Sequence, residues 1–521
     1  MSFAHAIATV GGLTMLSRVA GFARDILTAA ILGAGPVADA FFVALKLPNF
    51  FRRLFAEGAF TVSFVPLFSA ELQRNGRRAA QGFAEEALAV MVTVLLPFVI
   101  AMVAAMPWLM HALAPGFVDE PAKFALAVDF ARMTFPYLLL VSLVALLGGV
   151  LNSLDRFGPF AAAPIAFNLT LIAALLVARE AGMPAGLIMS QAVTVAGIVQ
   201  LVWLAASCRA AGIRLRLRLP RLTPGVKKLM VLMVPGAIGT GVMQINLFIN
   251  IVLASLLPSG AVSFLYYADR LNQLPLGVIG IAIGTALLPV LSRHVAGGDH
   301  GAVRHFLSRA LEFSLMLGLP AAVALLITAQ PIIHVLFERG AFGPHETSAT
   351  AQALAAYAIG IPAFVIVKVL SAAFFARQDT GTPVRVAIAV TLTNAALGLV
   401  LIQPLGHVGI ALATGVTAWM NAALLGWLLH ARGNFQIDDR LRRRAPRLLA
   451  AGLVMGVALQ AASWLLAPWL DGPTVVRTTA LAALVGIGAA VYFAVAHGIG
   501  GVRLGEIGIL LKRAPEPPGA A

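Results

Sequence analysis

The chain has 521 residues, of which 60% are hydrophobic and only 11% are charged. A soluble protein of this length needs more charge to cover its surface, so the composition excludes an ordinary soluble fold. The net charge is +15, but in a membrane protein the position of basic residues matters more than their sum, and no nucleic-acid partner is expected. The single cysteine, Cys208, excludes an internal disulfide and a multi-cysteine metal site.

Apolar runs of about 18–25 residues recur along the chain, and each is long enough to cross about 30 Å of hydrocarbon as a helix. They predict an all-α integral membrane protein with about fourteen spans. The predicted spans are 6–31, 37–66, 84–111, 124–151, 160–178, 185–207, 228–256, 263–291, 307–329, 350–375, 384–403, 408–430, 447–468 and 477–498. Charged residues interrupt the first apolar run, so it does not resemble a cleavable signal and is expected to stay in the protein.

Basic residues gather on alternate connections between these spans, namely around 74–78, 209–228 and 432–447. The opposite connections, such as 257–262 and 403–407, are short and poor in lysine and arginine. The positive-inside rule places the basic side in the cytoplasm, and both termini with it. Topology is the expected reason for these basic loops, and a ligand role is the alternative.

The predicted organisation has two sets of six spans. An N-terminal six-helix bundle covers 1–208, a basic linker 209–228, a second six-helix bundle 229–431, a basic loop 432–446, two extra helices 447–500 and a tail 501–521. The same offset separates Pro136 from Pro362 and Asn168 from Asn394, and a polar break follows each fourth span. This indicates a parallel duplication about an axis along the membrane normal, an arrangement that transporters use.

The first two predicted spans carry eight charged residues, and each would cost about 2.5–3.5 kcal/mol at the centre of a bilayer. The basic ones are Arg18, Arg24, Lys46, Arg52 and Arg53, and the acidic ones are Asp25, Asp39 and Glu57. These residues must face either water or one another. The alternatives are therefore a set of mutually satisfied ion pairs and a functional, net positive cavity.

Helical spacing favours clustering of these charges. Asp39, Lys46, Arg53 and Glu57 fall on one stripe about 40° wide at about 100° per residue, and Pro48 is expected to bend the span and turn Arg52 inward. In the second half, a further Asp-Arg pair lies at 269–270. The planar donor fork of arginine matches phosphate oxygens, so a phosphate or diphosphate headgroup is the expected guest.

At these residues the sequence resembles the MurJ (MviN) family, flippases of the lipid-linked peptidoglycan precursor within the MATE-like exporter superfamily. The similar stretches are 17–25, 39–49, 52–60 and 266–270. The resemblance implies two six-helix bundles in a V around a central cationic cavity, with the last two helices forming a groove for the polyprenyl tail. It implies substrate-binding roles for Arg18, Arg24, Asp39, Arg52 and Arg270, with Lys46, Arg53 and Glu57 as neighbours and Asp25, Asn49 and Asp269 as secondary candidates.

The implied cargo is lipid II, undecaprenyl-diphosphate carrying a disaccharide-pentapeptide. It would move from the cytoplasmic to the periplasmic leaflet of the bacterial inner membrane by alternating access. The expected partners are lipid II, the phospholipid bilayer and cell-wall synthesis proteins, with a monomeric state and no cofactor. Many relatives carry a glutamate after the 268–270 motif, whereas this chain has Leu271, Asn272 and Gln273. Because Gln244, Asn246 and Asn250 are also neutral, sodium coupling is in doubt, and membrane potential or a monovalent cation (H⁺ or Na⁺) remains open.

Three other function classes were weighed against this one. A flippase of another polyprenyl-diphosphate glycan would need the same diphosphate site. A MATE-type multidrug exporter favours an aromatic, weakly acidic pocket, which the basic residues oppose. A Mg²⁺-dependent membrane enzyme would need a surface acidic cluster, and the nearest one, 438–439, lies among arginines and is interpreted as solvated charge. The sequence therefore predicts a transporter rather than an enzyme.

Overall fold

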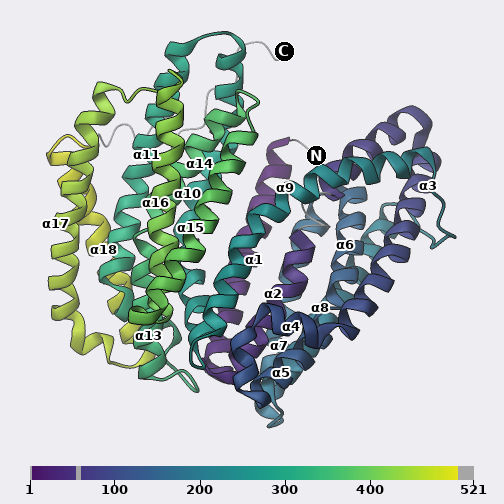
Figure 1. Cartoon of the computed structure of the whole chain (residues 1–521), viewed down its shortest axis with the longest axis horizontal. Coiled ribbons are helices and arrows are strands. Elements are labelled where there is room, and N and C mark those ends of the chain that lie inside the picture. Colours follow the sequence, from purple (N-terminus) through teal and green to yellow (C-terminus); the bar gives the residue numbers. More distant parts are fainter. Residues whose placement is uncertain (1–2, 54–59, 503–521) are drawn as a thin grey trace. The chain divides into compact units, whose positions relative to one another are not determined.

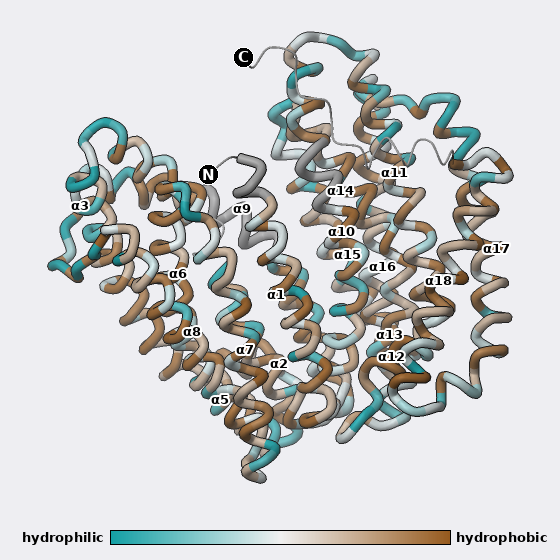
Figure 2. Tube along the Cα trace, turned by 180° about the vertical axis from the view of Figure 1, so that it is seen from behind, coloured by the Kyte–Doolittle hydropathy of each residue, from teal (hydrophilic) through white to brown (hydrophobic). Residues whose placement is uncertain are grey.

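The computed structural model describes residues 3–53 and 60–502, apart from the side chains at 3–7, 235–243 and 281–286. Within those ranges the chain is helical, and its one extended pairing is an isolated bridge between Arg339 and Phe342. Ten helical segments are long and apolar enough to cross a membrane. Figure 2 shows hydrophobic residues along the lengths of the helices. The predicted all-α membrane class is confirmed, and the count of fourteen spans stays a prediction.

The chain divides into two compact units. Unit 1 comprises Met1–Phe264 and Phe337–Glu346, and unit 2 comprises Leu265–Leu336 and Thr347–Ala521. The domain boundaries predicted from the sequence were drawn at the basic linker and the basic loop, which are features of membrane topology. They are not tested by this division into compact units and stay a prediction.

Unit 1 is built from nine α-helices and a short 3₁₀ helix within the described part of the chain (Figure 1). They are α1 (Phe3–Leu32), α2 (Pro36–Phe51), α3 (Thr61–Ala104), α4 (Met106–Leu113), η2 (Pro115–Asp119), α5 (Pro121–Thr134), α6 (Tyr137–Asn152), α7 (Gly158–Glu180), α8 (Ala185–Ala210) and α9 (Pro224–Ser255). Helix α1 packs on α7, and α2 packs on α5. The two most charged predicted spans thus each pack against another helix of the same unit.

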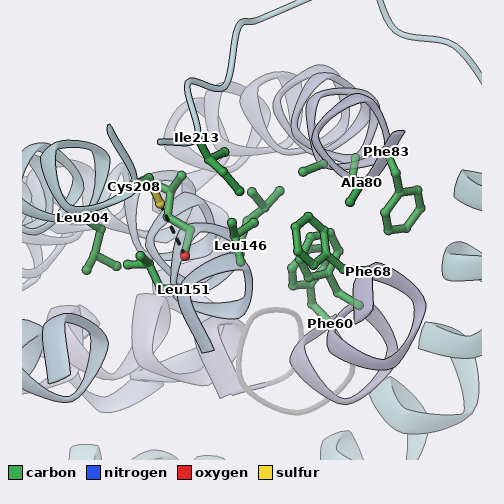
Figure 3. Packing of buried hydrophobic residues seen from close by; sticks show 14 of the residues in the cluster. Phe60, Phe68, Ala80, Phe83, Leu146, Leu151, Leu204, Cys208 and Ile213 are labelled. Atoms are coloured by element: carbon green, nitrogen blue, oxygen red, sulfur yellow. Dashed lines mark hydrogen bonds between the residues drawn. The ribbon is translucent and has the colours of Figure 1, made fainter. Parts of the chain in front are cut away.

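Helix α3 shows a difference from the predicted spans. The sequence predicted a loop between 66 and 84, but the chain is helical on both sides of Gly76, whose φ of 78° breaks the helix. Glycine adopts this left-handed conformation without the cost that a Cβ imposes. Phenylalanines at helical spacing form an apolar face on this helix, and the Phe64 and Phe83 rings stack across the turn with their centroids 5.6 Å apart. Figure 3 shows the surrounding cluster, in which Cys208 is a buried apolar residue.

The basic linker between α8 and α9 lies against α3. Arg218 forms an ion pair of 2.6 Å with the buried Glu85, which also accepts a hydrogen bond from the backbone N–H of Arg216. Thr223 caps α9 and donates to Glu86 at 2.7 Å. Two acids that the sequence analysis did not select therefore offset part of the linker's charge.

Two spans that were predicted as continuous are broken near a proline. The predicted span 124–151 divides into α5 and α6 at Pro136, and the span 350–375 divides into α13 (Pro344–Ala358) and α14 (Ile361–Phe375) beside Pro362. Proline lacks a backbone N–H and clashes with the preceding turn, which explains both breaks. The predicted duplication has this local feature in both halves, and it remains a prediction.

Unit 2 takes most of α10 (Ala261–Ala296) together with α13, α14 and the remaining helices. These are α11 (His300–Ile327), α12 (Ala329–Phe337), α15 (Gly381–Leu405), α16 (His407–Ala431), α17 (Asp439–Leu470) and α18 (Thr474–Gly498). Helices α17 and α18 lie side by side and pack against α11 (Figure 1). Large apolar residues on α17, including Val457 and Trp464, are about three-quarters exposed at 74% each. Such a face is suited to lipid.

Candidate functional site

Arg24 on α1 is held by residues from two helices. Its Nε and Nη2 atoms donate to Oδ1 of Asp25 at 3.1 and 2.7 Å, and its Nη1 donates to Oδ1 of Asn168 on α7 at 2.9 Å. Arg24 and Asp25 are both buried, at 7% and 3% exposure. This ion pair is of the kind expected if the charges satisfy one another, but further N–H donors of the guanidinium remain for another acceptor.

Asn168 is a positioning residue that the sequence analysis noticed only as part of the repeat. Its Nδ2 donates to the backbone oxygen of Ser17 at 3.1 Å, so the amide links Arg24 to the preceding part of α1. The amide lies close to α1 at Gly21, where a Cβ would be in van der Waals contact with Nδ2 of Asn168 at 3.4 Å. The signal that could have found Asn168 was a single amide inside an otherwise apolar span.

Asp39, near the start of α2, is buried with four polar partners. Its carboxylate accepts hydrogen bonds from the backbone N–H groups of Gly260 and Ser263 at 2.7 and 2.9 Å, and from the Ser263 hydroxyl at 2.6 Å. Lys123 of α5 forms an ion pair with it at 3.2 Å. A carboxylate on α2 therefore caps the first turn of α10, where backbone donors are unsatisfied by the helix itself.

Lys123 was missed by the sequence analysis and belongs to this cluster. It is 2% exposed, donates to Ser259 Oγ at 2.9 Å and lies 4.1 Å from the centroid of the Phe117 ring. Ser259 in turn donates to Glu120. The only signal in the sequence was that Lys123 and Asp39 stand at the starts of two predicted spans that begin on the same side of the membrane.

The basic residues at the end of α2 become more exposed along the chain. Lys46 is half-buried, Arg52 is half-buried at the end of the helix, and Arg53 is exposed and donates to Gln244 of α9 at 3.2 Å. Asn49 donates to the backbone oxygen of Leu45 at 2.8 Å within its own helix. The predicted partner Glu57 lies outside the described residues. Arg18 on α1 is exposed.

In unit 2, Arg270 lies on α10 above an aromatic ring. Its Nε and Nη2 donate to the hydroxyl of Tyr266 at 3.2 and 2.9 Å, and its guanidinium carbon lies 5.0 Å from the Tyr266 ring centroid. Asp269 accepts a hydrogen bond from Gln273 one turn later. Tyr266 therefore orients Arg270 and Gln273 orients Asp269, and all four residues belong to the same helix.

A second lysine that the sequence analysis missed is Lys368 on α14. Its side chain is exposed, and its Nζ occupies the space beside Gly280 of α10, where a side chain would collide with it. A lone lysine in the apolar run 361–375 was the available signal.

The chemistry of unit 1 favours an anion. The described candidates of the first two predicted spans comprise five basic residues and two carboxylates. Each of the two carboxylates forms an ion pair with a buried cation. The excess of basic over acidic residues among these candidates consists mainly of arginines, which bind phosphate oxygens in a planar, two-pronged manner.

Comparison with known proteins gives a consistent result. The sequence model of the family described as "Lipid II flippase MurJ" matches residues 28–479. The "Probable lipid II flippase MurJ" of Rhizobium meliloti (strain 1021) is 48% identical, with 98% of this chain and 97% of that protein covered. The "Lipid II flippase MurJ" of Burkholderia cenocepacia is 36% identical, with 87% and 89% covered.

Solved structures share the fold. A structure titled "Lipid II flippase MurJ, inward closed conformation" superposes with a TM-score of 0.76 at 24% identity, covering 94% of this chain and 98% of that chain. An inward-facing multidrug transporter of the MATE family superposes with a TM-score of 0.69 at 16% identity, covering 82% and 98%. At these identities the likeness establishes the fold alone.

Proposed function

Because the chain belongs to the lipid II flippase MurJ family, we propose that it moves lipid II from the cytoplasmic to the periplasmic leaflet of the bacterial inner membrane by alternating access. It is a multi-pass membrane transporter. The observation that carries the proposal is the excess of arginine and lysine on α1 and α2, inside segments where each charge is costly. An anionic headgroup compensates that charge, and lipid II provides one in its diphosphate.

The diphosphate is bound by Arg18, Arg24 and Arg52, with Lys46 and Arg53 adding positive charge, and Arg270 of unit 2 is proposed as a further substrate cation. Two unit charges about 4 Å apart attract by about 4 kcal/mol at the effective dielectric near a protein surface. Several such contacts act against the cost of taking a diphosphate partly out of water, which is several kcal/mol per ion.

Asp39 has a different role in this proposal. Its carboxylate is occupied by Lys123 and by the first turn of α10, so it positions α2 and the start of α10 rather than touching the cargo. Asp25 positions Arg24 in the same way.

The energy source and the surroundings complete the proposal. Membrane potential or a monovalent cation, H⁺ or Na⁺, drives the return of the empty transporter, and the neutral residues Gln244, Asn246 and Asn250 on α9 argue against a sodium site there. The protein acts as a monomer in the bilayer, with both termini in the cytoplasm and with cell-wall synthesis proteins as partners.

The proposal is tested with purified protein in liposomes that contain lipid II or a different polyprenyl-diphosphate glycan, with and without a membrane potential. We expect lipid II to cross the bilayer at least tenfold faster than the other glycan, and the potential to change that rate. Equal rates for the two lipids would favour a flippase of another glycan. Export of an organic cation without lipid movement would favour a multidrug exporter.

A further inference from the structure

Unit 2 contains an apolar groove that is separate from the candidate residues described above. It has a volume of about 530 Å³ and lies between α11, α14, α16 and the start of α17. Leu311 and Leu315 of α11, Ile366 and Leu370 of α14, and Leu441 and Ala445 of α17 line it. Helices α11, α14 and α17 each contribute two such residues four positions apart, which lie one above the other on the same face, and α16 contributes Gly426. The groove therefore has three apolar walls that run along the helix axes, a shape that suits an extended hydrocarbon chain.

One charged side chain, Arg442, also lines the groove. Two neighbouring arginines of α17 form ion pairs with an acidic residue. Arg440 and Arg444 both bind Glu312 of α11, Arg440 at 3.1 Å, and Arg309 binds Glu312 and Asp438. Arg442 is exposed, and no acid lies within ion-pair distance of it among the residues that the structure describes.

The neighbouring ion pairs keep this arrangement fixed. Asp438 caps α17 by accepting from the backbone N–H of Leu441 at 2.8 Å. Burial would raise the pKa of Asp438, but the hydrogen bonds from Leu441 and Arg309 outweigh burial and hold that pKa below its usual range. Glu312 and Asp438 are thus bound to other arginines, and neither of them forms an ion pair with Arg442.

We propose that this groove binds one acyl chain of an anionic phospholipid and that Arg442 binds the phosphate of the same lipid. The lining is apolar except for one cation at a helix start, which matches a lipid with a hydrocarbon chain and a negative headgroup. Residues 432–447 carry six arginines beside the membrane-crossing α17, and basic clusters at such positions bind anionic lipids. The site is distinct from the residues assigned to the cargo and does not depend on the transport function.

The test measures lipid binding to the purified protein by native mass spectrometry. Phosphatidylglycerol is compared with phosphatidylcholine of identical acyl chains, in the wild type and in Arg442→Gln, Arg443→Gln and Ala445→Phe. Arg443→Gln is the matched control, because Arg443 is also exposed and lies outside the groove lining. We expect Arg442→Gln to lower phosphatidylglycerol affinity about fivefold and to leave phosphatidylcholine unchanged. Ala445→Phe fills the groove and is expected to weaken both lipids, and melting temperatures confirm that each variant is folded.

Two results would overturn the proposal. An equal loss of phosphatidylglycerol binding in Arg442→Gln and Arg443→Gln would mean that the basic surface attracts anionic lipid without a defined site. Displacement of the bound phospholipid by undecaprenyl phosphate, with the same sensitivity to Ala445→Phe, would assign the groove to the polyprenyl tail of the cargo instead.

Discussion

Replacement of Arg24 by alanine is expected to lower the rate of lipid II translocation at least tenfold, the largest functional effect of any single change in unit 1. Arg24 is the candidate cation with the most fixed geometry, because Asp25 and Asn168 hold three of its N–H groups. A charge-assisted hydrogen bond to the diphosphate contributes about 1.5–3 kcal/mol, so the loss in translocation rate should be at least tenfold. The measurement is the rate of lipid II movement in liposomes.

The single variant also removes one member of the buried Arg24–Asp25 ion pair, and breaking a buried pair in this way costs about 3–5 kcal/mol of stability. The double variant Arg24→Ala/Asp25→Asn removes both charges and separates the two effects. We expect it to regain the melting temperature but not translocation. Recovery of translocation together with stability would show that Arg24 has a structural role and does not contact the cargo.

The second large effect is expected at the buried pair of Asp39 and Lys123. Neither side chain is more than 2% exposed, so Lys123→Met should lower the melting temperature strongly by leaving the Asp39 carboxylate unpaired. Asp39→Asn retains an oxygen that can accept from Gly260 or Ser263, and therefore tests the charge alone. The double variant Asp39→Asn/Lys123→Met should lose less stability than the sum of the losses in the two single variants.

The matched control for this pair is on the same helix. Arg132 and Asp129 of α5 lie 3.8 Å apart but are 43% and 57% exposed, so Arg132→Gln should change the melting temperature little. Purely additive losses from Asp39→Asn and Lys123→Met would contradict the pairing.

Hydropathy alone predicted where most helices lie, because a run of apolar residues long enough to cross a bilayer has few alternatives to a helix. It did not predict the local breaks. The interruption at Pro136 requires knowledge of the proline's backbone chemistry as well as hydropathy, and the turn at Gly76 depends on phenylalanines packing across it.

The candidate charges were found in the sequence, but their partners were not. The helical stripe placed Asp39 with Lys46 and Arg53, whereas the structure buries Asp39 with Lys123 from a distant part of the chain. Glu312 of α11 likewise pairs with Arg440 and Arg444 of α17, which are distant from it in the sequence. A charged residue near the end of a predicted span resembles one that reaches the interface, and only tertiary packing distinguishes the two.

The central claim is that arginines of this protein bind the lipid diphosphate. It is tested most directly by the affinity of the purified protein for undecaprenyl diphosphate, with uncharged undecaprenol as the reference ligand. The variants are Arg18→Ala, Arg52→Ala and Arg270→Ala, with Arg132→Gln as control. We predict that the diphosphate binds at least tenfold more tightly than undecaprenol and that each of the three alanine variants, but not the control, loses most of that difference. Equal binding of both lipids, or no change in the three variants, would contradict the account.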